Sequence, residues 1–209
     1  MRSFFRRRFI MRRMAFFRVR RIEILGARYV TPGDILARLH VDTLASVWNP
    51  TAPLVERVAT HPGIRSAVVR RKMPGTLVVE VTERPPIALV PTPSGFRAYD
   101  ERGVALPIDL ARVHVDAPVL AQRDTAILGL LARIRTGMPS LYDRVSAIRR
   151  TGGKELLLQL ETVPVRTMLD VTLARLTEIA PVEADLARRQ LRASEIDLRY
   201  RDQVVARLP

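Results

Sequence analysis

The sequence predicts an α+β fold with two domains, in which a small β-α-α-β-β domain precedes a mixed α+β domain that ends in a β-hairpin edge. Segments with period-2 apolar alternation occur beside short segments with helical spacing, and most strands come in hairpin pairs. The consecutive prolines of Arg84-Pro85-Pro86 cannot continue a sheet interior, so they mark a boundary. A chain of 209 residues that is 47% hydrophobic is large enough to give each domain a core.

The first domain reads as one strand, two short helices and a hairpin. Thr31 and Pro32 form a helix start, because threonine is a good N-cap and proline is tolerated at the first helical position. His61-Pro62-Gly63 stops the second helix. The expected strands are Arg18–Leu25, Ile64–Lys72 and Thr76–Glu83, and the expected helices run from Pro32 to near His40 and from about Pro53 to Thr60. Helices this short need a three-stranded sheet to cover.

The second domain reads as a meander, a helix, a hairpin, further helix and a closing hairpin. Asp124 or Thr125 caps a helix whose apolar residues repeat at helical spacing. Segment 169–180 reads as helical, with Pro181 kinking it or starting another helix. The expected strands are 87–90, 96–99, 104–107, 145–149 and 155–160, and the expected helices are 125–135, 169–180 and 186–191.

The closing hairpin is the segment with the clearest functional meaning. Ile196, Leu198 and Tyr200 alternate with charged residues, which predicts a strand with one buried face. A last strand that starts at Gln203 and ends with the chain is expected at a sheet edge, where unpaired backbone groups must be blunted or given a partner strand. Two readings stay open at this point: an ordinary edge capped by Arg207 and Pro209, or a strand-receiving edge.

The net charge of +14 is concentrated at the N-terminus. Nine of the 35 basic residues are arginines ahead of Glu23, the first acidic residue, which leaves 26 basic against 21 acidic residues in the rest of the chain. The arm of residues 1–17 mixes these arginines with phenylalanine, methionine and isoleucine, and such a mixture suits an anionic membrane surface. Nucleic-acid binding and a solvated tail are the alternatives for the arm, and we expect no nucleic-acid partner.

Enzymatic chemistry has no support in the sequence. Cysteine is absent, and the three histidines lie in different predicted elements without metal-ligand spacing. The chain has no nucleophile elbow, phosphate-binding glycine loop or zinc-protease motif. Asp100, Glu101, Glu80 and Glu83 occupy turns and strand ends, which are usual positions for solvated acids. We therefore expect a binding or scaffolding protein without catalytic residues, metal or cofactor.

Several segments in order along the chain resemble the FtsQ/DivIB family of bacterial cell-division proteins. The early segments are similar to a POTRA domain, and the ending Asp-Leu-Arg-Tyr behind a second α+β domain makes the resemblance more specific. The segments that carry it are 17–26, 29–30, 61–71, 73–77, 81–88, 100–103 and 196–200. The resemblance implies an arm at 1–17, a POTRA domain at 18–84 and an FtsQ-type β domain at 85–209.

The resemblance also implies a function. It implies a non-enzymatic divisome scaffold at the septum, anchored in the inner membrane with most of the chain extracytoplasmic. This scaffold would bind FtsB- and FtsL-like coiled-coil membrane proteins by accepting a strand, and would link early to late division proteins. The implied partner-binding residues are Arg149 or Arg150, Tyr200 at the end of the penultimate strand, Gln203, Val204, Val205, Ala206, Arg207 and Leu208, and Arg71 marks an implied POTRA recruitment surface.

Two features depart from the family pattern. No apolar run of the arm approaches the roughly 20 residues that a spanning helix needs. Either an apolar helix precedes Met1 in a longer protein, which we favour because Phe16-Phe17-Arg18-Val19 resembles its outer flank, or the arm attaches peripherally. Leu208 stands near a position where some relatives carry an aromatic residue. The alternative function is a POTRA component of an outer-membrane assembly or secretion system.

Overall fold

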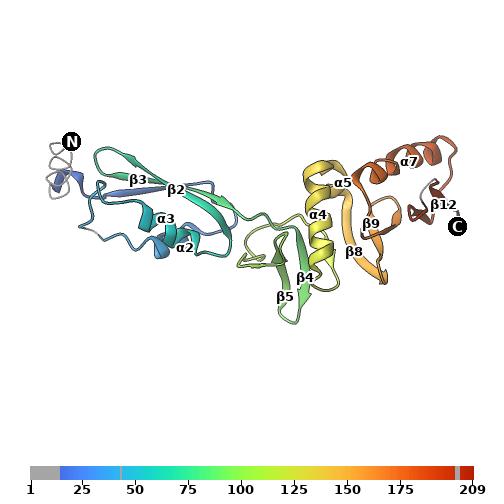
Figure 1. Cartoon of the computed structure of the whole chain (residues 1–209), viewed down its shortest axis with the longest axis horizontal. Coiled ribbons are helices and arrows are strands. Elements are labelled where there is room, and N and C mark those ends of the chain that lie inside the picture. The colour runs from blue at the N-terminus through green and yellow to red at the C-terminus, as the bar shows by residue number, and fades with distance from the viewer. Residues whose placement is uncertain (1–14, 43, 201–202) are drawn as a thin grey trace. The chain divides into compact units, whose positions relative to one another are not determined.

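The computed structural model describes residues 15–42, 44–200 and 203–209. The predicted arm therefore lies outside the described residues except at its end. The chain divides into two compact units: residues up to Pro85 with Pro107–Asp109 form the N-terminal unit, and Pro86–Leu106 with Leu110–Pro209 form the C-terminal unit. Both units combine helices and strands, which confirms the predicted α+β fold class (Figure 1).

The N-terminal unit has the predicted β-α-α-β-β order. After a short 3-10 helix η1 (Ala15–Phe17), its elements are β1 (Arg21–Leu25), α2 (Pro32–Leu39), α3 (Ala52–Ala59), β2 (Ile64–Lys72) and β3 (Thr76–Glu83). The sheet order is β1-β3-β2, with β1 parallel and β2 antiparallel to the central strand β3. Both helices lie on one face of this sheet (Figure 1), and their buried residues form a core with those of β2 and β3.

Local signals explain most of these boundaries. The Thr31 side chain accepts a hydrogen bond from the Asp34 N–H at 3.1 Å, and Pro32 opens α2 as predicted. His40 ends α2 in the left-handed conformation. The first strand begins later than predicted, at Arg21, because the chain before it pairs with the loop between the helices: Val19 N–H donates to Ala45 O at 2.9 Å.

The C-terminal unit is built on one nine-stranded mixed sheet of order β12-β11-β10-β9-β8-β7-β4-β5-β6. Its strands are β4 (Ala88–Thr92), β5 (Gly95–Tyr99), β6 (Ala105–Leu106), β7 (Val119–Leu120), β8 (Val145–Gly152), β9 (Glu155–Leu160), β10 (Pro164–Met168), β11 (Glu195–Asp197) and β12 (Val205–Arg207). Its helices are α4 (Thr125–Gly137), α5 (Pro139–Arg144), α6 (Leu173–Leu176) and α7 (Ile179–Arg188).

One face of this sheet carries the core. Asp124 caps α4 through hydrogen bonds from the N–H groups of Ala126 and Ile127. The helix buries Leu128, Leu131 and other apolar residues in one cluster with residues of β8, β9 and β10. None of the helices in the described part of the chain combines the length and apolar character needed to cross a bilayer.

The prediction for residues 161–191 was partly wrong. The sequence suggested helix over 169–180, whereas the structure places strand β10 just before this segment, the single-turn helix α6 within it and the start of α7 at Ile179. β10 gains its backbone partners from β9 on one side and the distant β11 on the other, which short-range spacing does not reveal. Pro181 lies in the first turn of α7, where a missing N–H costs no helical hydrogen bond.

Candidate partner-binding edge

Strand β12 ends the nine-stranded sheet, as the sequence predicted for the closing hairpin. It pairs antiparallel with β11 through Glu195↔Arg207, Ile196↔Ala206 and Asp197↔Val205. Within the described chain it has no strand on its other side. The hairpin is drawn in red beside the C-terminus in Figure 1. This side of β12 can therefore accept a further strand.

The direction of individual backbone groups follows from the hydrogen bonds of the hairpin. The Arg207 carbonyl accepts from the Ser194 N–H at 2.7 Å and from the Ser194 hydroxyl at 3.1 Å, so Arg207 faces β11. Backbone groups alternate in direction along a strand, so Val205 also faces β11 and Ala206 faces away from it. The N–H and C=O of Ala206 are the groups that β12 offers to an added strand.

The strand behind β12 is held by ionic contacts on the outer face of the sheet. Arg166 on β10 donates two hydrogen bonds to the Glu195 carboxylate, at 2.9 and 2.8 Å, and these contacts lower the pKa of Glu195. Such a bidentate pair fixes geometry better than a single contact. It joins β11 to the sheet interior.

Asp197 is the buried member of this outer face, although its period-2 position predicted exposure. It is 0% exposed, and its Oδ2 accepts from Arg199 Nη2–H at 2.7 Å. Arg199 in turn donates to Glu155 on β9 at 2.6 Å. The hydrogen bonds from Arg199 lower the pKa of Asp197, so the carboxylate stays charged at neutral pH. We call Glu155, Arg166, Glu195, Asp197 and Arg199 the ion network.

Sequence reasoning did not identify the ion network. The available signal was the alternation of Glu195, Asp197 and Arg199, which places three charges on one face of a strand. What the sequence could not supply was the pairing of β11 with β10, which brings Arg166 opposite Asp197.

Tyr200 does not end the penultimate strand, contrary to the prediction. β11 stops at Asp197, whose Oδ1 accepts from the Arg199 N–H at 3.1 Å and so turns the chain away from the strand. Tyr200 is 47% exposed in the connection that follows. Among the residues beyond it, Gln203 and Leu208 are exposed, Val204 packs partly on the core, and Arg201 and Asp202 lie outside the described residues.

The two predicted arginines of β8 differ in their surroundings. Arg150 donates to the Asp124 carboxylate at 2.6 Å and to the Gly153 carbonyl at 2.6 Å. Arg149 is exposed, and its side chain makes no hydrogen bond or ion pair with the described residues. The register Arg149↔Leu157↔Arg166↔Asp197↔Val205 places Arg149 on the same face as the ion network. At a strand spacing of about 4.8 Å, the four steps from β8 to β12 span roughly 19 Å.

Arg71, the predicted residue of the recruitment surface, is engaged within its own unit. Its Nε–H donates to the Val47 carbonyl at 2.6 Å and its Nη2–H to the Asn49 carbonyl at 3.0 Å. These bonds hold the α2–α3 loop against the edge strand β2. The side chain of Arg71 therefore holds the α2–α3 loop in position.

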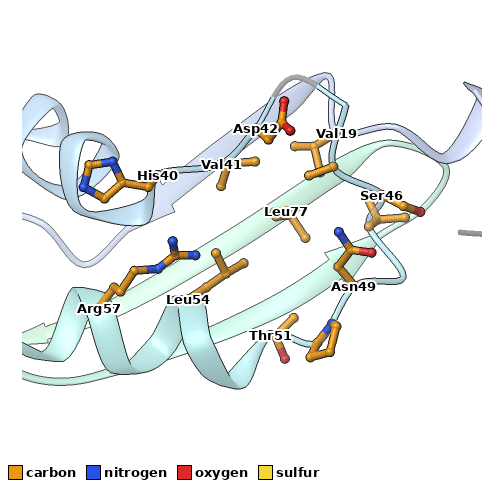
Figure 2. Close-up of a pocket in the computed structure, with 13 residues that line it drawn as sticks. Val19, His40, Val41, Asp42, Ser46, Asn49, Thr51, Leu54, Arg57 and Leu77 are labelled. Atoms are coloured by element: carbon orange, nitrogen blue, oxygen red, sulfur yellow. The ribbon is translucent and has the colours of Figure 1, made fainter.

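The same loop borders a pocket of about 220 Å³ in the N-terminal unit. Figure 2 shows Leu54 and Leu77 inside it and His40, Asp42 and Arg57 around its opening.

His40 is exposed, His61 is buried in the stop after α3, and His114 is exposed in the other unit. No cluster of three or more histidine and acidic residues in the described part of the chain could hold a metal ion.

Comparison with known proteins shows similarity to bacterial cell-division proteins. Residues 17–84 match the family model described as POTRA domain, FtsQ-type. The cell division protein FtsQ of Rhodothermus marinus is 29% identical over 91% of this chain and 77% of the relative. The FtsQ proteins of Salinibacter ruber and Mycolicibacterium smegmatis are each 30% identical, over 70% and 60% of this chain. The chain is therefore similar to FtsQ cell-division proteins, and its residues 17–84 match the FtsQ-type POTRA domain.

The match to whole FtsQ proteins is incomplete. The chain spans 58% of the Salinibacter ruber relative and 36% of the Mycolicibacterium smegmatis relative. The solved major extracytoplasmic domain of DivIB from Geobacillus stearothermophilus aligns at 19% identity and a TM-score of 0.38, over 51% of this chain and 97% of that one. The similarity to FtsQ rests on the sequence matches, and the match to the Rhodothermus marinus protein covers 91% of this chain, so it extends into both units.

Proposed function

We propose that this FtsQ-like chain is a non-enzymatic divisome scaffold that captures a strand from an FtsB-like partner at β12. FtsL-like coiled-coil proteins would join through the same partner, and the complex would link early to late septation proteins. The observation that carries this proposal is the position of β12 at the end of the sheet, with the Ala206 backbone facing outward. Strand addition requires such a free row of backbone groups.

The surroundings of β12 support the same function. The ion network holds β11, so the receiving strand is presented on a fixed support. Arg149, which is exposed on the same face, is available to an acidic side chain of the partner, whereas Arg150 is already paired with Asp124. Of the two arginines, we therefore assign the contact with the partner to Arg149.

We further propose that the chain works at the division septum on the extracytoplasmic side of the inner membrane. Similarity to FtsQ cell-division proteins supports the septal location. The arginines and phenylalanines of the arm suit the headgroup region of an anionic membrane. The alternative, a POTRA component of an outer-membrane assembly system, is weaker because the family model that matches is the FtsQ type.

The test is substitution of the outward-facing residue of β12. Ala206→Pro removes its N–H and places a ring where the added strand must approach. We expect Kd for the extracytoplasmic segment of the FtsB homologue from the same bacterium to rise about tenfold, measured by isothermal titration calorimetry. Val205→Pro is less informative, because the Val205 N–H faces β11 and its loss would break the hairpin itself.

Ala206→Val is the matched control, because valine keeps the N–H and favours a strand. We expect this variant to bind within about twofold of the unsubstituted chain. Circular dichroism should show both variants folded. Equal binding by folded Ala206→Pro and the unsubstituted chain would contradict strand addition at β12.

A further inference from the structure

Arg175 on α6 makes an unusual set of contacts with the connection between β11 and β12. Its Nη2 donates to the carbonyl of Gln203 at 2.6 Å and also to the carbonyl of Tyr200, and its Nε donates to the carbonyl of Leu198 at 3.4 Å. The Nη1 pairs with Glu178. One guanidinium thus holds the chain just after β11 and just before β12.

The side chain of Arg175 is itself fixed from several directions. It is 15% exposed, and the Thr172 hydroxyl accepts its backbone N–H at 3.2 Å. The next residue, Leu176, is 1% exposed in the core of the C-terminal unit. The guanidinium of Arg175 is therefore held by the core, and the three carbonyl groups that accept from it are held in place with it.

The carbonyl of Gln203 that Arg175 holds lies two residues before β12. A change in its position moves Val204 and the start of the receiving strand. Backbone groups alternate in direction along a strand, so the position of the chain at the start of β12 determines whether the Ala206 N–H and C=O face outward. A shift by one residue would turn the Ala206 groups towards β11.

We propose that Arg175 is the positioning residue of the receiving edge, which holds the register in which β12 offers Ala206 to a partner strand. This inference rests on the proposed function of β12. In this proposal, Arg175 itself does not contact the partner. It predicts that binding depends on a residue that lies behind the hairpin and not on its free side.

Arg175→Lys and Arg175→Gln test this role in the whole chain. Lysine keeps the positive charge beside Glu178 but lacks the planar fork that reaches three carbonyls. We expect both variants to raise the amide hydrogen-exchange rates of Val205 and Arg207 about tenfold in the free protein, measured by NMR. We expect both to raise Kd for the FtsB segment by a similar factor.

Arg188→Gln is the control, since Arg188 pairs with Asp185 at 2.9 Å on the exposed surface of α7 and its side chain is 77% exposed. It should leave exchange and binding at the values of the unsubstituted chain. Unchanged exchange at Val205 and Arg207 in Arg175→Gln, or full rescue by lysine, would overturn the positioning role. Failure of the unsubstituted chain to bind the segment would instead refute the proposed function, while the exchange result would still decide the role of Arg175 in the hairpin.

Discussion

At the scale of single residues, His61 is the group whose protonation bears most directly on stability. It is 5% exposed, and its Nδ1 accepts the Gly63 N–H at 3.0 Å. Burial lowers the pKa of His61, and the neighbouring Arg38 lowers it further, while Asp34 and Glu83 act in the opposite direction with smaller effect. The folded N-terminal unit therefore favours the neutral imidazole.

We predict that the N-terminal unit loses stability as pH falls through about 6.5, the ordinary pKa of histidine in the unfolded chain. Below that pH the unfolded chain binds the proton more readily than the folded unit, so stability keeps falling until the lowered folded pKa is passed and stays at that lower level below it. His61→Asn keeps a hydrogen-bond acceptor near Nδ1 without titrating. Trp48 is the single tryptophan and lies in this unit, so its fluorescence reports urea unfolding there.

The control for this titration is His114→Gln, which changes an exposed histidine of the other unit. It should keep the pH dependence of the Trp48 transition, and His61→Asn should weaken it between pH 7 and 5. If both variants show the slope of the unsubstituted chain, His61 is not the titrating group.

At the scale of elements, β8 carries two adjacent arginines with different expected roles. Arg150→Ala removes the partner of Asp124, the N-cap of α4, and should lower the free energy of unfolding by about 0.5–1 kcal/mol. Arg149→Ala should leave stability within about 0.5 kcal/mol, because Arg149 has no ion pair among the described residues, and should weaken FtsB binding. Urea unfolding and calorimetry at two salt concentrations distinguish these effects.

The same measurements would also show whether Arg150, and not Arg149, contacts the partner. If Arg150→Ala weakens binding more than Arg149→Ala while both variants keep the stability of the unsubstituted chain, Arg150 is the arginine that faces the partner. A loss of binding in Arg149→Ala that high salt does not reduce would argue against an ionic contact.

Elements with local signals were predictable from the sequence, and those defined by distant pairing were not. β2 and β3 have the predicted bounds, because valine-rich alternation flanks a Pro-Gly turn. The start of α2 also follows its cap. β10 and the end of β11 were missed, since β10 has one of its two partners in the distant strand β11 and β11 ends where one buried carboxylate turns the chain.

At the scale of the whole molecule, the sequence predicted the position of the C-terminal edge strand better than the contacts that support it. The exposed residues Gln203, Arg207 and Leu208 and the half-buried Val205 lie where the closing hairpin was expected. The ion network and Arg175 were not predicted, because their contacts join β9, β10 and α6 to residues near the C-terminus. The edge strand thus has local sequence signals, whereas the groups that hold it are dispersed along the chain.

Deletion of residues 204–209 tests whether the receiving strand is separable from the rest of the molecule. The truncated chain loses β12, and β11 becomes the last strand, with the Glu195 and Asp197 carboxylates beside the new edge. We expect Kd for the FtsB segment to rise at least about tenfold, because the outward backbone groups of Ala206 are gone and charged residues disfavour strand addition. The urea midpoint reported by Trp48 should not change, since Trp48 lies in the other compact unit. A chain that lacks only Pro209 should match the full chain in both measurements, and full binding by the chain that ends at Gln203 would place the receiving strand elsewhere.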